Sequence, residues 1–202
     1  MLVIVNTGLG NFGSVSNMLK KIGVESTTSN DIDVINNASK LIMPGVGSFD
    51  YGMKRLKELN LIQVLNTRVV NEKCPVLGIC LGMQLMTSGS EEGTELGLGW
   101  VDAVTVKFKH DKRNGALKTP HMGWNTVFPE IEAKLFGRSN EEQRFYFVHS
   151  YYIQPTTDAI VSATCNYGKQ FCCAIESGNI FGTQFHPEKS HRYGISLLKR
   201  FS

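Results

Sequence analysis

Short apolar runs alternate with helix-like patterns in the first half of the chain. Residues 2–5 form an apolar run typical of a buried strand, and a polar, glycine-rich turn follows at residues 6–13. The next apolar residues recur at i, i+3, i+4 and i+7, the spacing of one helix face. They are Val15, Met18, Leu19 and Ile22. Gly23 then suits the C-terminal cap of that helix.

The same alternation continues as far as residue 87. Further strands are expected at residues 40–43 and 75–79, and helices at residues 48–58, 61–72 and 81–87. Strands that alternate with helices in this way favour a parallel sheet covered by helices on both faces.

Strand-like segments with short connections dominate the second half. They are residues 98–108, 124–128, 145–148, 159–165, 171–176 and 180–185. An antiparallel extension of the sheet would accommodate them, and a last helix is expected at residues 190–200. No repeat, linker or boundary interrupts the pattern, so we expect an α/β fold with a central mixed, mainly parallel sheet, in which residues 1–202 form a single domain.

Composition excludes several classes of function. Hydrophobic residues make up 42% and charged residues 19% of the chain, and the net charge of +3 is too mild to indicate nucleic acid or a membrane surface. No run approaches the roughly 20 apolar residues of a membrane span, and the N-terminus does not resemble a signal peptide.

Five cysteines without zinc-like spacing are expected to be free thiols in a reducing cytosol. The densest basic stretch, residues 107–113, suits either a solvated loop or a docking surface.

The sharpest chemical signal is Gly78-Ile79-Cys80-Leu81-Gly82. A nucleophile between small residues at a strand-to-helix turn is the nucleophile-elbow pattern. The helix that follows favours the thiolate of Cys80, and the N–H of Leu81 would point toward a developing oxyanion. The alternative is a buried core cysteine.

A base for this nucleophile is expected at His186. Pro187 favours an extended conformation at His186, and residues i and i+2 of an extended chain project to the same side. Glu188 can therefore hydrogen-bond one ring nitrogen and leave the other facing the thiol. The alternative is a solvated histidine and glutamate at a strand end.

Another glycine-rich turn, Pro44-Gly45-Val46-Gly47, follows an expected strand. Glycines allow backbone amides to approach a ligand closely, so this turn could supply a second oxyanion donor. Taken alone, the turn is more typical of a purely structural role.

Two segments together resemble the class I glutamine amidotransferases, which use a Cys-His-Glu triad. They are residues 75–84, around Cys80, and residues 185–190, around His186. Four more segments extend the resemblance over nearly the whole chain, to the glutaminase subunit of imidazole glycerol phosphate synthase. These are residues 44–49, 90–93, 120–125 and 147–152.

The resemblance implies a flavodoxin-like architecture, L-glutamine as the substrate, no metal or organic cofactor, and a (β/α)₈-barrel synthase as the partner. Cys80 would be the nucleophile, His186 the base and then the acid, and Glu188 the group that orients the histidine. The residues implied in binding glutamine or its oxyanion are Val46, Gly47, Leu81, Gln84, Glu92, Ser150 and Tyr151. Trp124 would lie near the partner, although a core tryptophan is an equal alternative.

One departure from the family lies in residues 6–11, where an Asp-Tyr-Gly segment is usual and this chain has Asn-Thr-Gly-Leu-Gly-Asn. A paralogue that donates ammonia for an amidino sugar in surface-polysaccharide synthesis therefore stays an alternative. Two further alternatives are another cysteine enzyme of this architecture, such as a peptidase, and a non-catalytic regulatory module. The intact Cys80, His186 and Glu188 disfavour the last.

Overall fold

The computed structural model describes residues 1–109, 117–137 and 142–202 of the chain. Its elements, in chain order, are β1 (Leu2–Val5), α1 (Phe12–Lys21), β2 (Ser26–Ser29), α2 (Ile32–Asn36), β3 (Lys40–Gly45), α3 (Phe49–Glu58), α4 (Leu61–Asn66), a π-helical turn (Thr67–Asn71), β4 (Val76–Cys80), α5 (Leu81–Gln84), β5 (Ala103–Lys107), β6 (His121–Pro129), β7 (Gln143–His149), β8 (Tyr151–Pro155), a 3₁₀ turn (Asp158–Ile160), β9 (Val161–Asn166), β10 (Gln170–Ser177), β11 (Ile180–Thr183), a second 3₁₀ turn (Pro187–Lys189) and α6 (His191–Phe201).

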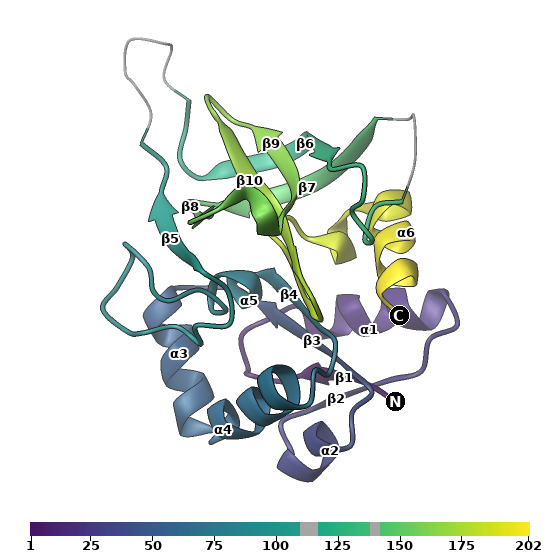
Figure 1. The fold of residues 1–202 in the computed structure, drawn as a ribbon. Helices are drawn as coiled ribbons and strands as arrows, with labels where there is room; N and C mark the ends of the chain where they lie inside the picture. Colours follow the sequence, from purple (N-terminus) through teal and green to yellow (C-terminus); the bar gives the residue numbers. More distant parts are fainter. Residues whose placement is uncertain (110–116, 138–141) are drawn as a thin grey trace.

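The described strands form one mixed sheet in the order β2-β1-β3-β4-β11-β10-β9-β6-β7, with β8 beside β10 and β5 beside β8. The strands from β2 to β11 are parallel, and β10, β9, β6 and β7 continue the sheet in antiparallel fashion. In Figure 1 the parallel strands lie below and the antiparallel extension above. The structure therefore confirms the expected α/β fold with a mixed central sheet.

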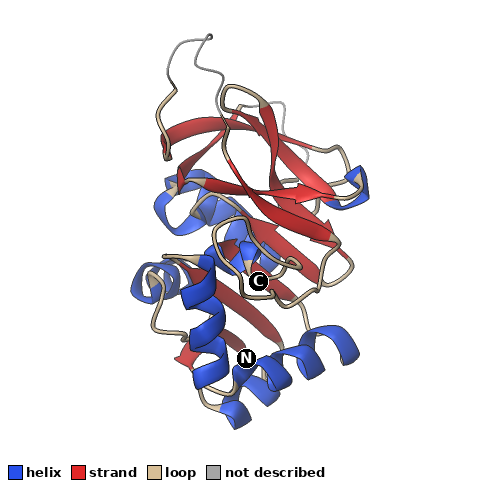
Figure 2. Cartoon of the chain, turned by 90° about the vertical axis from the view of Figure 1, so that its left-hand side faces the viewer, coloured by secondary structure: helices blue, strands red, loops and turns tan. Residues whose placement is uncertain are grey.

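Helices cover both faces of the parallel half, as Figures 1 and 2 show. Helices α1 and α6 pack together on one face, where Val15 and Leu197 share a core with Ile42. Helices α2, α3 and α4 cover the other face, where Met53 packs near Leu41. Because side chains alternate along a strand, each buried strand of this half supplies both cores.

The expected elements of the first half are confirmed, with small shifts at their ends. The helix expected at residues 81–87 is shorter, because α5 ends at Gln84. Gly23 caps α1 as expected, with a φ of 78° and its N–H donating to the carbonyl of Lys20. The sequence patterns did not predict β2, α2 or β8.

One strand expectation is wrong over part of its length. Residues 98–102 belong to a loop, and only Ala103–Lys107 forms the strand β5. The loop lies against the end of α5, since Leu98 N–H donates to the Leu85 carbonyl and Trp100 N–H to the Met86 carbonyl. Residues 159–160 likewise lie in a 3₁₀ turn before β9 rather than in a strand.

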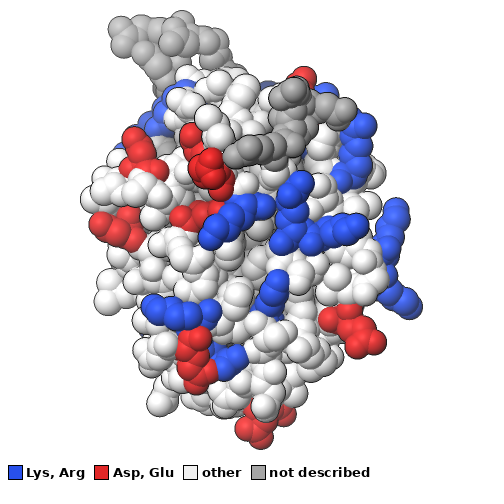
Figure 3. Space-filling model, turned by 45° about the vertical axis from the view of Figure 1, so that its right-hand side comes forward, with Lys and Arg blue, Asp and Glu red and all other residues white. Residues whose placement is uncertain are grey.

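Basic side chains gather across the middle of the face in Figure 3, with acidic ones scattered around them. This view brings forward the side of the molecule on which α1 and α6 lie. Both helices have two basic residues in their last turn, which complement the negative end of the helix dipole. No helix within the described residues is long and apolar enough to cross a membrane.

Candidate active site

Cys80 stands at a strained turn between β4 and α5. Its φ of 55° and ψ of −110° lie where residues other than glycine are rarely found. The neighbouring glycines make the turn possible: a Cβ on Gly82 would lie 1.7 Å from the Met43 carbonyl oxygen, and one on Gly78 would lie 2.6 Å from the Met83 nitrogen. The structure therefore contains the nucleophile-elbow geometry that the sequence predicted.

His186 and Glu188 form a buried pair behind the elbow. The Nδ1 atom of His186 lies 2.7 Å from Oε1 of Glu188, and both side chains are almost fully buried. The contact is as predicted, and His186 itself is extended as expected, with φ −100° and ψ 98°. The chain does not stay extended beyond it, because Pro187–Lys189 is a 3₁₀ turn. The backbone N–H of His186 donates to the Tyr146 carbonyl, and its own carbonyl accepts from the Ser190 hydroxyl.

The surroundings of His186 favour its charged form. Burial opposes a charge on the ring, but the thiol of Cys80 and the carboxylate of Glu188 outweigh this and raise the pKa of His186 to about 10. Since Nδ1 is engaged by Glu188, the other ring nitrogen, Nε2, is the one left for proton exchange with the sulfur.

A cavity of about 430 Å³ opens in front of Cys80 and His186. Its lining includes every residue that the resemblance implied in substrate binding: Val46, Gly47, Leu81, Gln84, Glu92, Ser150 and Tyr151. Pro120, Val148 and His149, which the sequence did not single out as site residues, complete it. The turns after β3, β4 and β11 meet here because carboxyl ends of parallel strands share one edge of a sheet.

The turn after β3 does not present the amide of Val46 to the cavity. The Val46 N–H donates to the carbonyl of Leu9, with an N···O distance of 3.1 Å. Leu9 belongs to residues 6–11, the segment in which the chain departs from the family pattern. Gly47 has a φ of 105°, so the backbone after Val46 is in a conformation that suits glycine.

Two histidines that the sequence analysis did not single out, His121 and His149, lie beside the cavity. His149 Nδ1 lies 2.7 Å from the Tyr151 carbonyl oxygen, His121 Nδ1 lies 3.0 Å from His149 Nε2, and the Asn125 amide lies 3.2 Å from His121 Nε2. A carbonyl can only accept, so one arrangement of neutral tautomers satisfies all three bonds. Burial lowers the pKa of His121 to about 4 and that of His149 to about 3. The two histidines are 28 positions apart in the chain, so no local spacing indicates the pair.

Trp124 is 39% exposed and stacks on His191, with ring centroids 5.5 Å apart and planes 5° apart. The core alternative for this tryptophan is therefore wrong.

In the basic stretch, the Lys107 N–H and the Lys109 ammonium both bind Glu91, which lowers the pKa of that carboxyl. Residues 110–113 of the stretch lie outside the described residues.

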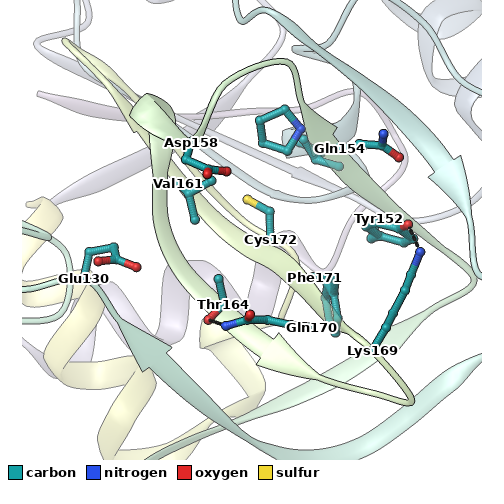
Figure 4. Close-up of a pocket in the computed structure, with 12 residues that line it drawn as sticks. Glu130, Tyr152, Gln154, Asp158, Val161, Thr164, Lys169, Gln170, Phe171 and Cys172 are labelled. Atoms are coloured by element: carbon teal, nitrogen blue, oxygen red, sulfur yellow. Dashed lines mark hydrogen bonds between the residues drawn. The ribbon is translucent and has the colours of Figure 1, made fainter.

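A larger hollow of about 760 Å³ lies over β8, β9 and β10 (Figure 4). It contains a second cysteine, Cys172, but burial raises the pKa of this thiol to about 12, and none of the described residues that line the hollow is a histidine. All five cysteines are free thiols, as expected. No cluster of three or more potential metal ligands occurs among the described residues.

Comparison with known proteins agrees with this geometry. The sequence profile of the family "Glutamine amidotransferase class-I" matches residues 3–202. Among solved structures, a glutamine amidotransferase has a TM-score of 0.76 at 19% identity over 98% of this chain and 96% of its own. PurLQS from Thermotoga maritima has a TM-score of 0.71 at 18% identity over 99% and 96%. The chain belongs to the class I glutamine amidotransferases.

Closer relatives narrow this class. Imidazole glycerol phosphate synthase subunit HisH 2 of Methanococcus maripaludis is 51% identical over 100% of this chain and 98% of its own length. The Pseudomonas aeruginosa protein of the same name is 47% identical over the same shares. Within its class, the chain belongs to the family of HisH subunits of imidazole glycerol phosphate synthase.

Proposed function

We propose that the chain is the glutaminase subunit of imidazole glycerol phosphate synthase, a cytosolic enzyme of histidine biosynthesis. It hydrolyses L-glutamine to glutamate and ammonia and passes the ammonia to a synthase subunit. The observation that carries the proposal is a strained cysteine beside a buried histidine–carboxylate pair, at the mouth of a cavity of about 430 Å³. Membership of the HisH family supports this acceptor over an amidino sugar, and glutamine chemistry over a peptidase or a non-catalytic module.

In the first half-reaction, the Cys80 sulfur attacks the side-chain carbonyl carbon of glutamine. The carbonyl π electrons move onto oxygen, and the N–H of Leu81 stabilises the oxyanion. When the tetrahedral intermediate collapses, the C–N bond breaks and His186 gives its proton to the leaving nitrogen, so ammonia departs and a thioester remains.

In the second half-reaction, water replaces ammonia. His186, now neutral, removes a proton from the water as it attacks the thioester carbonyl carbon. Collapse of the second intermediate breaks the C–S bond, releases glutamate and returns the thiolate–imidazolium pair. Glu188 keeps the His186 ring in one orientation through both steps and stabilises its charge.

The partner is a synthase subunit with a (β/α)₈-barrel fold that forms a heterodimer with this chain. Trp124, half exposed on β6, is the contact that we propose, together with the basic residues 107–113. Nothing in the mild net charge favours a nucleic acid or a membrane as a further partner.

Partner binding would also switch the enzyme on. In the described conformation the Val46 N–H is occupied by the Leu9 carbonyl, so it cannot hold the oxyanion. A flip of the peptide between Gly45 and Val46 would release that donor, and losing one such donor typically costs about 10²–10³ in rate. The synthase must bind the flipped state more tightly, or the equilibrium does not shift.

The test measures glutamate release from the purified chain alone, with the synthase, and with the synthase and its acceptor substrate. We expect a low rate alone and a rise of about 10²-fold or more in the full assembly. Cys80→Ala should abolish the stimulated rate, whereas the matched control Cys172→Ala should keep most of it. Full activity of the chain alone would contradict the switch, and a stimulated rate that survives in Cys80→Ala would contradict the nucleophile.

A further inference from the structure

Gln184 lies directly beside the thiol of Cys80, although neither the elbow nor the histidine–carboxylate pair accounts for it. The side chain is fully buried, and its Nε2 atom lies 3.6 Å from the Cys80 sulfur. Its Oε1 atom accepts a hydrogen bond of 3.0 Å from Nε2 of Gln84. The backbone is fixed as well, because the Gln184 N–H donates to the Cys173 carbonyl.

The direction of these hydrogen bonds is set by a backbone carbonyl. Nε2 of Gln84 also lies 3.1 Å from the carbonyl oxygen of Tyr151, which can only accept. The amide nitrogen of Gln84 therefore faces Tyr151, and its second hydrogen goes to Oε1 of Gln184. This leaves the N–H of Gln184, not its oxygen, facing the sulfur of Cys80.

A second donor holds the same carbonyl in place. Nδ1 of His149 lies 2.7 Å from the Tyr151 oxygen, so both lone pairs of this oxygen are used. His149 is in turn held by His121 in the buried pair described above. Each bond between this pair and the thiol thus has a fixed donor: His149 and Gln84 both donate to the Tyr151 oxygen, and Gln84 also donates to Gln184. A reversed Gln184 amide would break the bond from Gln84 and direct an oxygen toward the sulfur.

We propose that Gln184 is a positioning residue for the nucleophile: its N–H, oriented through Gln84 by the Tyr151 carbonyl, stabilises the thiolate of Cys80 and fixes the direction of the sulfur. The inference rests on the proposed function, which makes Cys80 the nucleophile. A hydrogen bond to the charged form of a group favours that form. Gln184 would thus complement His186, which supplies the positive charge.

The test is the pH dependence of Cys80 alkylation by iodoacetamide, which needs neither glutamine nor the synthase. The label on Cys80 is measured by peptide mass spectrometry between pH 5 and 9. Gln184→Met keeps the length of the side chain but removes the donor. We expect alkylation about tenfold slower at pH 7, with the profile moved to higher pH, because a hydrogen bond to a charged group is lost. The matched control is Gln170→Met, at the exposed start of β10, which should leave the profile unchanged.

A second variant guards against loss of packing. Gln184→Glu keeps the shape but places a carboxylate oxygen against the sulfur, so its profile should move at least as far as that of Gln184→Met. If neither variant folds, as judged by circular dichroism, Gln84→Met is measured, because it keeps Gln184 but removes the donor that orients it. An unshifted profile in a folded variant would overturn the inference while Cys80 stays reactive. A Cys80 that is unreactive in the unaltered chain would overturn the proposed function as well.

Discussion

At His186, two neighbours with different roles act on one ring. The sulfur of Cys80 exchanges a proton with the ring in the proposed mechanism, whereas Glu188 touches only Nδ1, at 2.7 Å. Both raise the pKa of the ring against the effect of burial. Removing the ring and removing the carboxylate charge should therefore differ in cost.

We predict that His186→Ala costs at least about tenfold more of the synthase-stimulated rate than Glu188→Gln, because the first removes the proton carrier and the second only weakens its orientation. Glutamate release at saturating glutamine measures both. Glu188→Gln should also move the pH dependence of the rate, since the pKa of His186 falls when the carboxylate charge is lost. Equal losses in two folded variants would mean that Glu188 takes part in proton transfer itself.

Residue-level prediction succeeded where the signal is local. Cys80 lies between glycines, and Glu188 lies two residues from His186, so a short stretch of sequence contains both features. His149 and Gln184 gave no such signal. They bind through contacts with residues that are 28 and 100 positions away in the chain, and single-sequence patterns do not report such contacts.

At the scale of elements, the β4–α5 turn depends on the absence of side chains. A Cβ on Gly82 would lie 1.7 Å from the Met43 carbonyl oxygen, and backbone atoms of β3 cannot move aside as a flexible side chain can. Gly13, in α1, has nothing within 4 Å of the corresponding position. The two glycines offer a matched pair for the same substitution.

Gly82→Ala should lower the free energy of unfolding by about 3 kcal/mol, since overpacking of this kind forces backbone shifts. It should also lower the rate of glutamine hydrolysis, because the elbow holds Cys80. Gly13→Ala should raise stability by about 0.5–1 kcal/mol, because alanine favours the helix over glycine. Urea unfolding measures both, and a Gly82→Ala variant as stable as the unaltered chain would show that the turn can relax.

Elements with a strong apolar period were predictable, and those without it were not. β2 is Ser-Thr-Thr-Ser, an edge strand with no apolar alternation, and α2 has only five residues. The reverse error occurred at residues 98–102, where apolar residues suggested a strand. There Trp100 is held by its indole N–H, which donates to the Asn66 side chain, and the segment pairs with no strand among the described residues.

Across the whole molecule, the candidate site lies where the two halves of the sheet meet. Cys80 ends β4, and β11, the neighbouring parallel strand, leads into His186. β8, which begins at Tyr151 and pairs with β10, forms the opposite wall. The sequence predicted both halves of the sheet. It did not predict β8, so it gave no reason beyond the family resemblance for Ser150 and Tyr151 to face the thiol.

Since the two halves share one sheet, we propose that residues 1–202 form a single domain that unfolds in one transition. Its stability should be greatest near pH 6.5. Below this pH, histidines in the unfolded chain bind protons. In the folded chain His121 and His149 stay neutral, because burial lowers their pKa values to about 4 and 3. The unfolded state then binds more protons than the folded state, so the free energy of unfolding falls as the pH is lowered. Above pH 6.5, His186 has the opposite effect on stability. Its pKa is raised to about 10 in the folded state, so the stability that its proton contributes is lost as the pH rises toward 10.

The measurement is the free energy of unfolding in urea at several values between pH 5 and 6.5, where most carboxylates stay ionised. Each buried neutral histidine should add a slope of up to about 1.4 kcal/mol per pH unit. His149→Gln should reduce the slope by one histidine's share, whatever it does to absolute stability. His191→Asn, on the exposed start of α6, is the matched control and should leave the slope unchanged. A slope in His149→Gln equal to that of the unaltered chain would show that His149 is not held neutral in the folded protein. Two separate unfolding transitions would argue against a single domain.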